Sequence, residues 1–313
     1  MKIINELEQI PFLDNAVLTI GFFDGFHLGH RKIFSRLLES ARENQAQSLV
    51  LTFENHALTI IEPDKKPYYI SSLGFKKRFI EANNADYLIL LPFTQEFSRI
   101  TAEDFLIFLK NRFKKLKIIV GENFRFGFKN IGTVQTISDF ASASHGDLVL
   151  EAVHPVKLDH HRVSSSRIRN LIQNGSMHET QRLLLRNFSV ENTVYHGNGL
   201  GKKLGFPTAN LFLPGWQISP KYGVYYGKTR VENKVYDSMV FISNRKLDEV
   251  LTKTIIETHL FGFSGSLYGQ KIEVSLVSFI REPIQFTDSQ KLKEQIQKDR
   301  ETILKIMDGE KND

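Results

Sequence analysis

Two histidines spaced three residues apart, His27 and His30, close a glycine-containing turn in the stretch GFFDGFHLGH. Imidazole N–H donors can stabilise a phosphoryl group that gains negative charge during reaction. An apolar run at 17–20 precedes the turn, and helix-like spacing of apolar residues follows it over 31–43. A turn between a strand and a helix presents backbone N–H groups and the positive helix end to phosphate. The sequence therefore predicts a polyphosphate site at this turn.

The same two histidines admit two other interpretations. Imidazoles three residues apart can ligate a metal ion, but the chain has no cysteine and no obvious third ligand lies nearby in the sequence. They can also be surface histidines without a function. The strand before them, the helix after them and the glycines between favour the phosphate role.

Length and composition fit a soluble globular protein of two domains. The chain has 313 residues, of which 41% are hydrophobic and 24% are charged. No apolar run approaches the roughly 18–20 residues of a membrane helix, and the start MKIINELEQIPF has no signal-peptide core. We therefore expect a cytoplasmic protein. Its net charge of +6 suits anionic partners, nucleotides and nucleic acid alike, and does not choose between them.

Apolar runs alternate with helix-like segments in the first half of the chain. The runs that predict buried strands are 17–20, 48–53, 86–91, 117–121 and 147–153, and the predicted helices are 31–43, 73–82 and 102–113. This alternation predicts an α/β fold with a parallel sheet covered on both faces. Ligands of such sheets bind beyond the carboxyl ends of the strands, where the histidine turn is expected to lie.

Two further segments carry residue types that bind phosphate. VGENFRFG follows the fourth predicted strand, and its Arg125 either meets phosphate or is simply solvated. VSSSRIR opens a predicted helix, and its serines are N-cap candidates. This segment is either a capped helix with two surface arginines or a site where serine hydroxyls and Arg167 grip the β- and γ-phosphates.

Taken together, these motifs resemble a known family. The HxGH pattern is similar to the signature of nucleotidylyltransferases and class I aminoacyl-tRNA synthetases. GFFDGFHLGH, LTFENHAL, VGENFRFG and VSSSRIR resemble, in order, the adenylyltransferase module of prokaryotic bifunctional riboflavin kinase/FAD synthetases. The resemblance covers 1–186 and implies a Rossmann-like nucleotidyltransferase domain. It implies that an FMN phosphate oxygen attacks the α-phosphorus of ATP and that pyrophosphate leaves, usually with Mg²⁺.

The resemblance also implies the residues of the site. Catalytic roles are implied for His27, His30 and Arg167, and nucleotide contacts for Gly21, Phe23, Asp24, Gly29, Asn123, Arg125, Ser164 and Ser165. Phe22 departs from the family, in which Asn is common at this position. The neighbouring residues His160, His161 and Arg162 are expected to form a solvated loop.

Short alternating runs replace the helix–strand pattern beyond residue 186. Runs at 188–195, 223–231, 234–241, 253–260 and 271–279 predict a small antiparallel barrel, and 288–307 predicts a closing helix. The glycines of HGNGLGKKLGFPTANL let the backbone wrap a phosphate chain. In the same stretch, Thr208 and Asn210 are neutral oxygen ligands suited to Mg²⁺. On composition alone, a glycine-rich hairpin loop is the more frequent interpretation.

GFPTANL closely resembles the riboflavin kinase signature, which implies a riboflavin-kinase-like domain over 187–313. The resemblance implies that Glu257 takes the proton from the ribityl 5′-hydroxyl while Thr208 and Asn210 hold Mg-ATP. Nucleotide contacts are implied for Gly199, Gly201, Lys202, Gly205 and Thr208. The family usually has an Asn-Ile-Gly-x-x-Pro-Thr segment where this chain has Phe241 to Leu247, with Phe241, Ser243 and Lys246 as departures. Leu200 stands where a basic residue is frequent.

We therefore expect a bifunctional enzyme that makes FMN from riboflavin and FAD from FMN, with ATP and Mg²⁺ in both steps. Its partners are these small molecules, without a membrane. Two alternatives stay open: a monofunctional FMN adenylyltransferase with an impaired kinase domain, and an RNA-binding or regulatory protein on a synthetase-like fold. The absence of a KMSKS-like sequence and of a clustered basic-aromatic patch disfavours nucleic acid.

Overall fold

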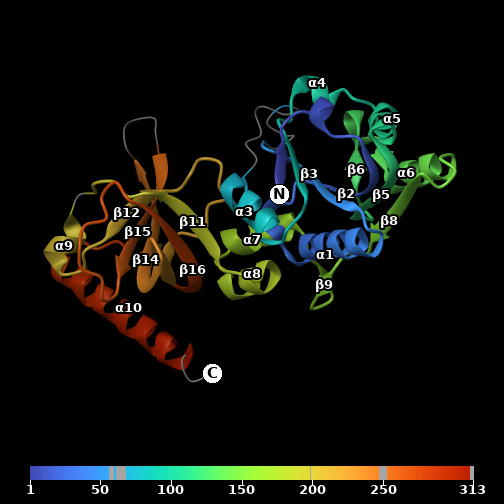
Figure 1. Ribbon diagram of the computed structural model, residues 1–313. Helices are drawn as coiled ribbons and strands as arrows, with labels where there is room; N and C mark the ends of the chain where they lie inside the picture. The colour runs from blue at the N-terminus through green and yellow to red at the C-terminus, as the bar shows by residue number, and fades with distance from the viewer. Residues whose placement is uncertain (56–59, 61–67, 198, 247–251, 311–313) are drawn as a thin grey trace. The chain divides into compact units, whose positions relative to one another are not determined.

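The computed structural model describes residues 1–55, 60, 68–197, 199–246 and 252–310 (Figure 1). The chain divides into two units, Met1–Ser165 and Ser166–Asp313. The domain boundary at 186/187 stays a prediction. Residues 56–58 of LTFENHAL, Asn198 of the glycine-rich stretch and Leu247 lie outside the described residues.

A six-stranded parallel sheet forms the centre of the first unit, as the alternation predicts. Its order is β1-β4-β3-β2-β5-β8. The strands are β1 (Lys2–Ile4), β2 (Leu13–Ile20), β3 (Gln47–Phe53), β4 (Tyr87–Leu91), β5 (Phe113–Gly121) and β8 (Leu148–Val153). The edge strand β1 was not predicted, because three residues carry no period, and β5 begins earlier than expected because α5 ends at Arg112.

Helices cover both faces of this sheet. The main ones are α1 (Leu28–Glu43), α3 (Leu73–Ala82), α5 (Ala102–Arg112) and α6 (Val134–Ser142), with the short α4 (Gln95–Ser98). Successive strand residues point to opposite faces. Accordingly Val17 packs in the cluster that holds residues of α1 and α3, while Leu18 packs in the cluster that holds residues of α5 and α6. Burial on both faces explains why the strands read as continuous apolar runs.

The second unit holds a nearly closed antiparallel barrel of order β11-β16-β13-β14-β15-β12. Its strands are β11 (Phe188–Thr193), β12 (Ala209–Phe212), β13 (Gly223–Val231), β14 (Lys234–Lys246), β15 (Thr252–Leu260) and β16 (Lys271–Arg281). The bridge between Tyr195 and Asn210 brings the two ends of the sheet together. The sequence analysis missed β12, whose four residues lie inside the glycine-rich motif.

Helices precede and follow the barrel, as expected. The helices α7 (Ser165–Gln173) and α8 (Met177–Leu184) precede it, the C-terminal α10 (Ser289–Glu310) follows it, and the short α9 (Leu200–Leu204) lies between β11 and β12. Ile303 of α10 packs against Val224 and Tyr226 of β13. The predicted fold class is confirmed in both halves. Among the described residues, no helix is both long and apolar enough to cross a bilayer.

Candidate active sites

Hydrogen bonds from the backbone of residues 70 and 71 hold the histidine turn in place. Phe23 adopts left-handed backbone angles, and Gly25 has a φ of 79° that favours glycine. The carboxylate of Asp24 accepts from the backbone N–H groups of Ile70 at 2.9 Å and Ser71 at 3.3 Å. Asp24 is thus buried and directed toward 70–71, away from the two cavities described below. In the structure, the Asp24 carboxylate supports the turn.

The two histidine rings lie face to face at the start of α1. Their centroids are 3.7 Å apart, and Nδ1 of His27 accepts from the backbone N–H of His30 at 3.4 Å. Burial and the charges of His27 and Lys76 hold the pKa of His30 well below its ordinary value. The ring is therefore neutral near pH 7 and presents one N–H donor. Nδ1 of His30 is enclosed and has no hydrogen-bond partner.

A cavity of about 280 Å³ lies above this turn. It collects eight of the predicted residues, namely Gly21, Phe23, His27, Gly29, His30, Asn123, Ser164 and Ser165. They come from the end of β2, the start of α1, the loop after β5 and the segment before α7. This is the carboxyl edge of the parallel strands, where the sequence placed the site. Among the described residues, no group of three His, Cys, Asp or Glu side chains could hold a metal ion.

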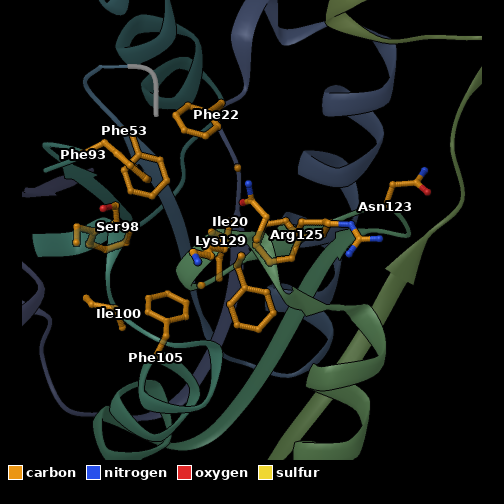
Figure 2. Close-up of a pocket in the computed structure, with 16 residues that line it drawn as sticks. Ile20, Phe22, Phe53, Phe93, Ser98, Ile100, Phe105, Asn123, Arg125 and Lys129 are labelled. Carbon is orange, nitrogen blue, oxygen red and sulfur yellow. The ribbon is translucent and has the colours of Figure 1, made fainter. Parts of the chain in front are cut away.

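A second cavity, of about 270 Å³, adjoins the first (Figure 2). Seven phenylalanines line it: Phe22, Phe53, Phe93, Phe97, Phe105, Phe124 and Phe126. Figure 2 shows the rings of Phe22, Phe53, Phe93 and Phe105 around the hollow, with Asn123 to one side. The two cavities share Ile20, Gly21, Asn123 and Phe124 as lining residues. A cavity with histidine, serine and arginine side chains in its lining and a cavity with many phenylalanines thus meet at Gly21 and Asn123.

Arg162 was expected in a solvated loop; the residue is exposed, as expected, but it lies in a short strand and not in a loop. The residue ends the hairpin of β9 (Lys157–Leu158) and β10 (His161–Arg162), and it lines the histidine cavity. With the amide of Asn123 turned to satisfy both groups, its oxygen accepts from the terminal nitrogens of Arg162. The one sequence feature that could have indicated this contact is the position of Arg162 directly before VSSSRIR. Arg125 lines the aromatic cavity instead, and Arg167 lies in α7, within the second unit.

In the second unit, one row of paired residues crosses the whole barrel. The register pairs residues in the order Tyr195, Asn210, Glu257, Phe241, Val224 and Arg281. Directly paired residues project from the same face of a sheet. The implied base Glu257 therefore lies between the implied metal ligand Asn210 and the departure Phe241. Val224 of this row packs against α10, so the row lies on the face that α10 covers.

A cavity of about 300 Å³ opens on this row. Its lining includes Gly201, Thr208, Phe241, Glu257, Arg281 and Asp299. Burial raises the pKa of Glu257, and the positive charge of Arg245 opposes that rise. Arg281 and Asp299 form a two-point ion pair at 2.8 and 2.6 Å, which joins β16 to α10 at the cavity wall.

The glycines of HGNGLGKKLGFPTANL shape this site in different ways. Gly199 and Gly205 flank α9 with positive φ angles of 68° and 89°, which favour glycine. Gly201 lies so close to the carbonyl of Phe206 that a Cβ would clash. Lys202 lies in α9 and does not line the cavity. Asn210 is buried, with Gly197 packed directly against its amide.

Comparison with known proteins bears on both units. A family model described as FAD synthetase matches residues 9–167, and one described as riboflavin kinase matches 184–307. Proteins named "bifunctional riboflavin kinase/FMN adenylyltransferase" are similar over nearly their whole length. The one from Buchnera aphidicola subsp. Schizaphis graminum is 32% identical over 97% of this chain and 98% of its own. Those from Haemophilus influenzae and Escherichia coli K12 are 32% and 31% identical, covering 93% and 96% of this chain and 94% and 95% of their own.

A solved structure has the same fold over almost the whole chain. It is described as a macrolide-efflux protein from Streptococcus pneumoniae and superposes with a TM-score of 0.86 at 26% identity, covering 96% of this chain and 97% of that one. The two family models together match most of the chain, and the relatives match 93–97% of it. The chain therefore belongs to the family of bifunctional riboflavin kinase/FAD synthetases.

Proposed function

We propose that the two reactions of this family occupy separate sites, with adenylyl transfer from ATP to FMN in the first unit and phosphorylation of riboflavin in the second. The observation that carries the first assignment is the meeting of two unlike cavities at Gly21 and Asn123. One cavity offers N–H and hydroxyl donors, and the other is walled by phenylalanine rings. The first suits a triphosphate and the second a flat apolar ring system.

In this arrangement the isoalloxazine ring lies among the phenylalanines and the FMN phosphate points toward Gly21. The triphosphate lies over the histidine turn, with its α-phosphorus between the two cavities. An oxygen of FMN attacks that phosphorus, and the bond to pyrophosphate breaks. The N–H of His30 and the first N–H groups of α1 stabilise the charge that develops. Ser164, Ser165 and Arg162 bind the leaving phosphates, and Arg167 remains a proposed partner of them.

In the second unit, Glu257 is the proposed base. It accepts the proton of the ribityl 5′-hydroxyl, whose oxygen attacks the γ-phosphorus of ATP while ADP leaves. Because burial raises the pKa of Glu257, the carboxylate is a better proton acceptor than an exposed one. The side-chain oxygens of Thr208 and Asn210 are neutral donors of the kind Mg²⁺ prefers, and the register places Asn210 beside Glu257. Bound Mg²⁺ would neutralise charge on the ATP phosphates.

The departure at Phe241 changes the wall of this cavity without removing the base. Phe241 is paired with Glu257 across β14 and β15, and both side chains line the cavity. An aromatic ring at this position adds apolar surface next to a flavin. The substrates proposed are thus ATP, riboflavin and FMN. A cytoplasmic location remains a proposal from the sequence.

Two measurements on the full chain test this assignment. With Mg-ATP, addition of FMN should release pyrophosphate and form FAD, and addition of riboflavin should release ADP and form FMN. Neither product should form from ATP alone. A folded protein that consumes no ATP on addition of either flavin would overturn the proposed function.

A further inference from the structure

Lys76 is a buried cation that lines neither the histidine cavity nor the aromatic cavity. Its side chain, on α3, is 6% exposed. Lysine is almost never buried to this degree unless it is paired. The described residues place no carboxylate within ion-pair distance of it. Its Nζ donates instead to the hydroxyl of Thr52 at 3.2 Å and to the carbonyl of Phe53 at 3.0 Å.

These contacts reach the walls of the aromatic cavity. The Thr52 hydroxyl in turn donates to the carbonyl of Phe22 at 3.4 Å. Phe22 and Phe53 both line the cavity, and their ring centroids are 5.0 Å apart. Lys76 therefore holds the end of β3 directly and the start of the histidine turn through Thr52. One ammonium group thus links the backbone carbonyls of two phenylalanines whose rings pack against each other in the cavity lining.

The charge of Lys76 also reaches the histidine pair. Asp24 is the acidic group that acts on it, and the Asp24 carboxylate is already engaged by the backbone N–H groups of 70–71. His30 is the other titratable group that the charge of Lys76 reaches, because Lys76 contributes to the lowered pKa of His30. The ammonium thus lies behind the turn over which the proposed α-phosphorus is placed.

We propose that Lys76 is a positioning residue for adenylyl transfer, which holds β3 and the histidine turn in register and supplies a fixed positive charge behind His30. The inference rests on the proposed function of the first unit. Preorganised charge aimed at a site of developing negative charge stabilises the transition state without reorganisation during reaction. It also keeps His30 a neutral donor.

The energetics of burial argue that this lysine does not serve stability. Taking an ammonium group out of water without a paired carboxylate is costly. That cost appears as a pKa of Lys76 lowered to about 8, mainly by burial. A methionine has a similar length and none of this cost. We infer that a lysine buried at this cost has a role in the site through its charge and its two hydrogen bonds.

The test compares Lys76→Met with Lys77→Met, the adjacent lysine on the same helix, for which the structure records no polar contact. In Lys76→Met, kcat for FAD formation should fall about tenfold, less than for loss of a donor that touches the transition state. Lys77→Met should match the wild type. Riboflavin phosphorylation, in the other unit, should be unchanged in both variants, and thermal unfolding with circular dichroism checks that the first unit is folded.

A pH profile separates positioning by charge from a merely structural role. Because the pKa of Lys76 is about 8, the wild-type rate of FAD formation should fall above that pH toward the rate of Lys76→Met. Without the charge, His30 gains a proton more easily, so the acid limb of Lys76→Met should move to higher pH. Thr52→Val breaks the link to Phe22 but keeps the charge, so its acid limb should stay in place.

Three results have defined meanings here. If wild-type protein forms no FAD, the proposed function fails. If the wild type forms FAD and folded Lys76→Met has the same kcat and the same pH profile, the Lys76 inference alone is overturned. Should Lys76→Met not fold, Lys76→Gln keeps a donor for Phe53 without the charge, and an unshifted acid limb in that variant overturns the inference equally.

Discussion

Replacing Gly197 by alanine should damage riboflavin phosphorylation selectively. A Cβ at this position would lie 2.6 Å from Nδ2, 2.7 Å from Cγ and 2.8 Å from Oδ1 of Asn210. The backbone of Gly197 is not in the left-handed region, so the amide is the obstacle. Ordinary contact begins near 3.4 Å, so the amide must move by roughly 0.8 Å. Misplacing a catalytic group by about 1 Å costs on the order of a hundredfold in rate.

The assay is riboflavin-dependent release of ADP by the full chain at saturating Mg-ATP. We expect a fall of about a hundredfold for Gly197→Ala, with FAD formation from added FMN unchanged. Gly215→Ala is the matched control, since a Cβ there has no atom within 4 Å and no positive φ opposes it. A Gly197→Ala protein with full kinase activity would refute the reasoning that the position of Asn210 limits this reaction.

Two further predictions concern charge. In Arg245→Ala, the acid limb of riboflavin phosphorylation should move to higher pH, because the charge of Arg245 lowers the pKa of Glu257 against the effect of burial. If the acid limb of the pH profile does not move, the charge of Arg245 does not act on the proposed base Glu257. Glu151→Gln should destabilise the protein by about 1 kcal/mol at neutral pH, since Arg36 and Lys117 hold the pKa of Glu151 at about 2. The ion pair stabilises the protein fully at a pH above the ordinary pKa of a glutamate, and this stabilisation is lost as the pH falls toward 2. In urea unfolding, Glu151→Gln should therefore reduce the free energy of unfolding less near pH 3.5 than at neutral pH. An equal reduction at both pH values would contradict this reasoning.

Much of the fold could be predicted because its strands are buried on both faces. Runs such as 48–53 and 86–91 have unbroken apolar cores at 49–51 and 87–91, and each became an interior strand of the sheet. Most of the elements that were missed are short, although the nine-residue helix α6 was missed as well. A three-residue edge strand and the four residues of β12 carry no measurable period, and their pairing depends on partners far along the chain.

The residues of the candidate site also differ in how far the sequence could predict them. Those in a contiguous motif could be found, and those that the fold brings together from distant positions could not. The turn with His27 and His30 is contiguous, so its residue types and spacing revealed it. The aromatic cavity draws phenylalanines from positions between 22 and 126, and no local pattern marks them. Arg162 meets Asn123 only through the folded hairpin. Lys76 resembles any lysine on an amphipathic helix until its burial is known.

The central claim is that two separate sites carry the two reactions. The most direct measurement is the rate of each reaction, with added FMN or added riboflavin, in the full-length variants His30→Ala and Glu257→Gln. We predict that His30→Ala loses FAD formation and keeps FMN formation, while Glu257→Gln does the reverse. Loss of both activities in either variant, with the protein still folded, would contradict the account.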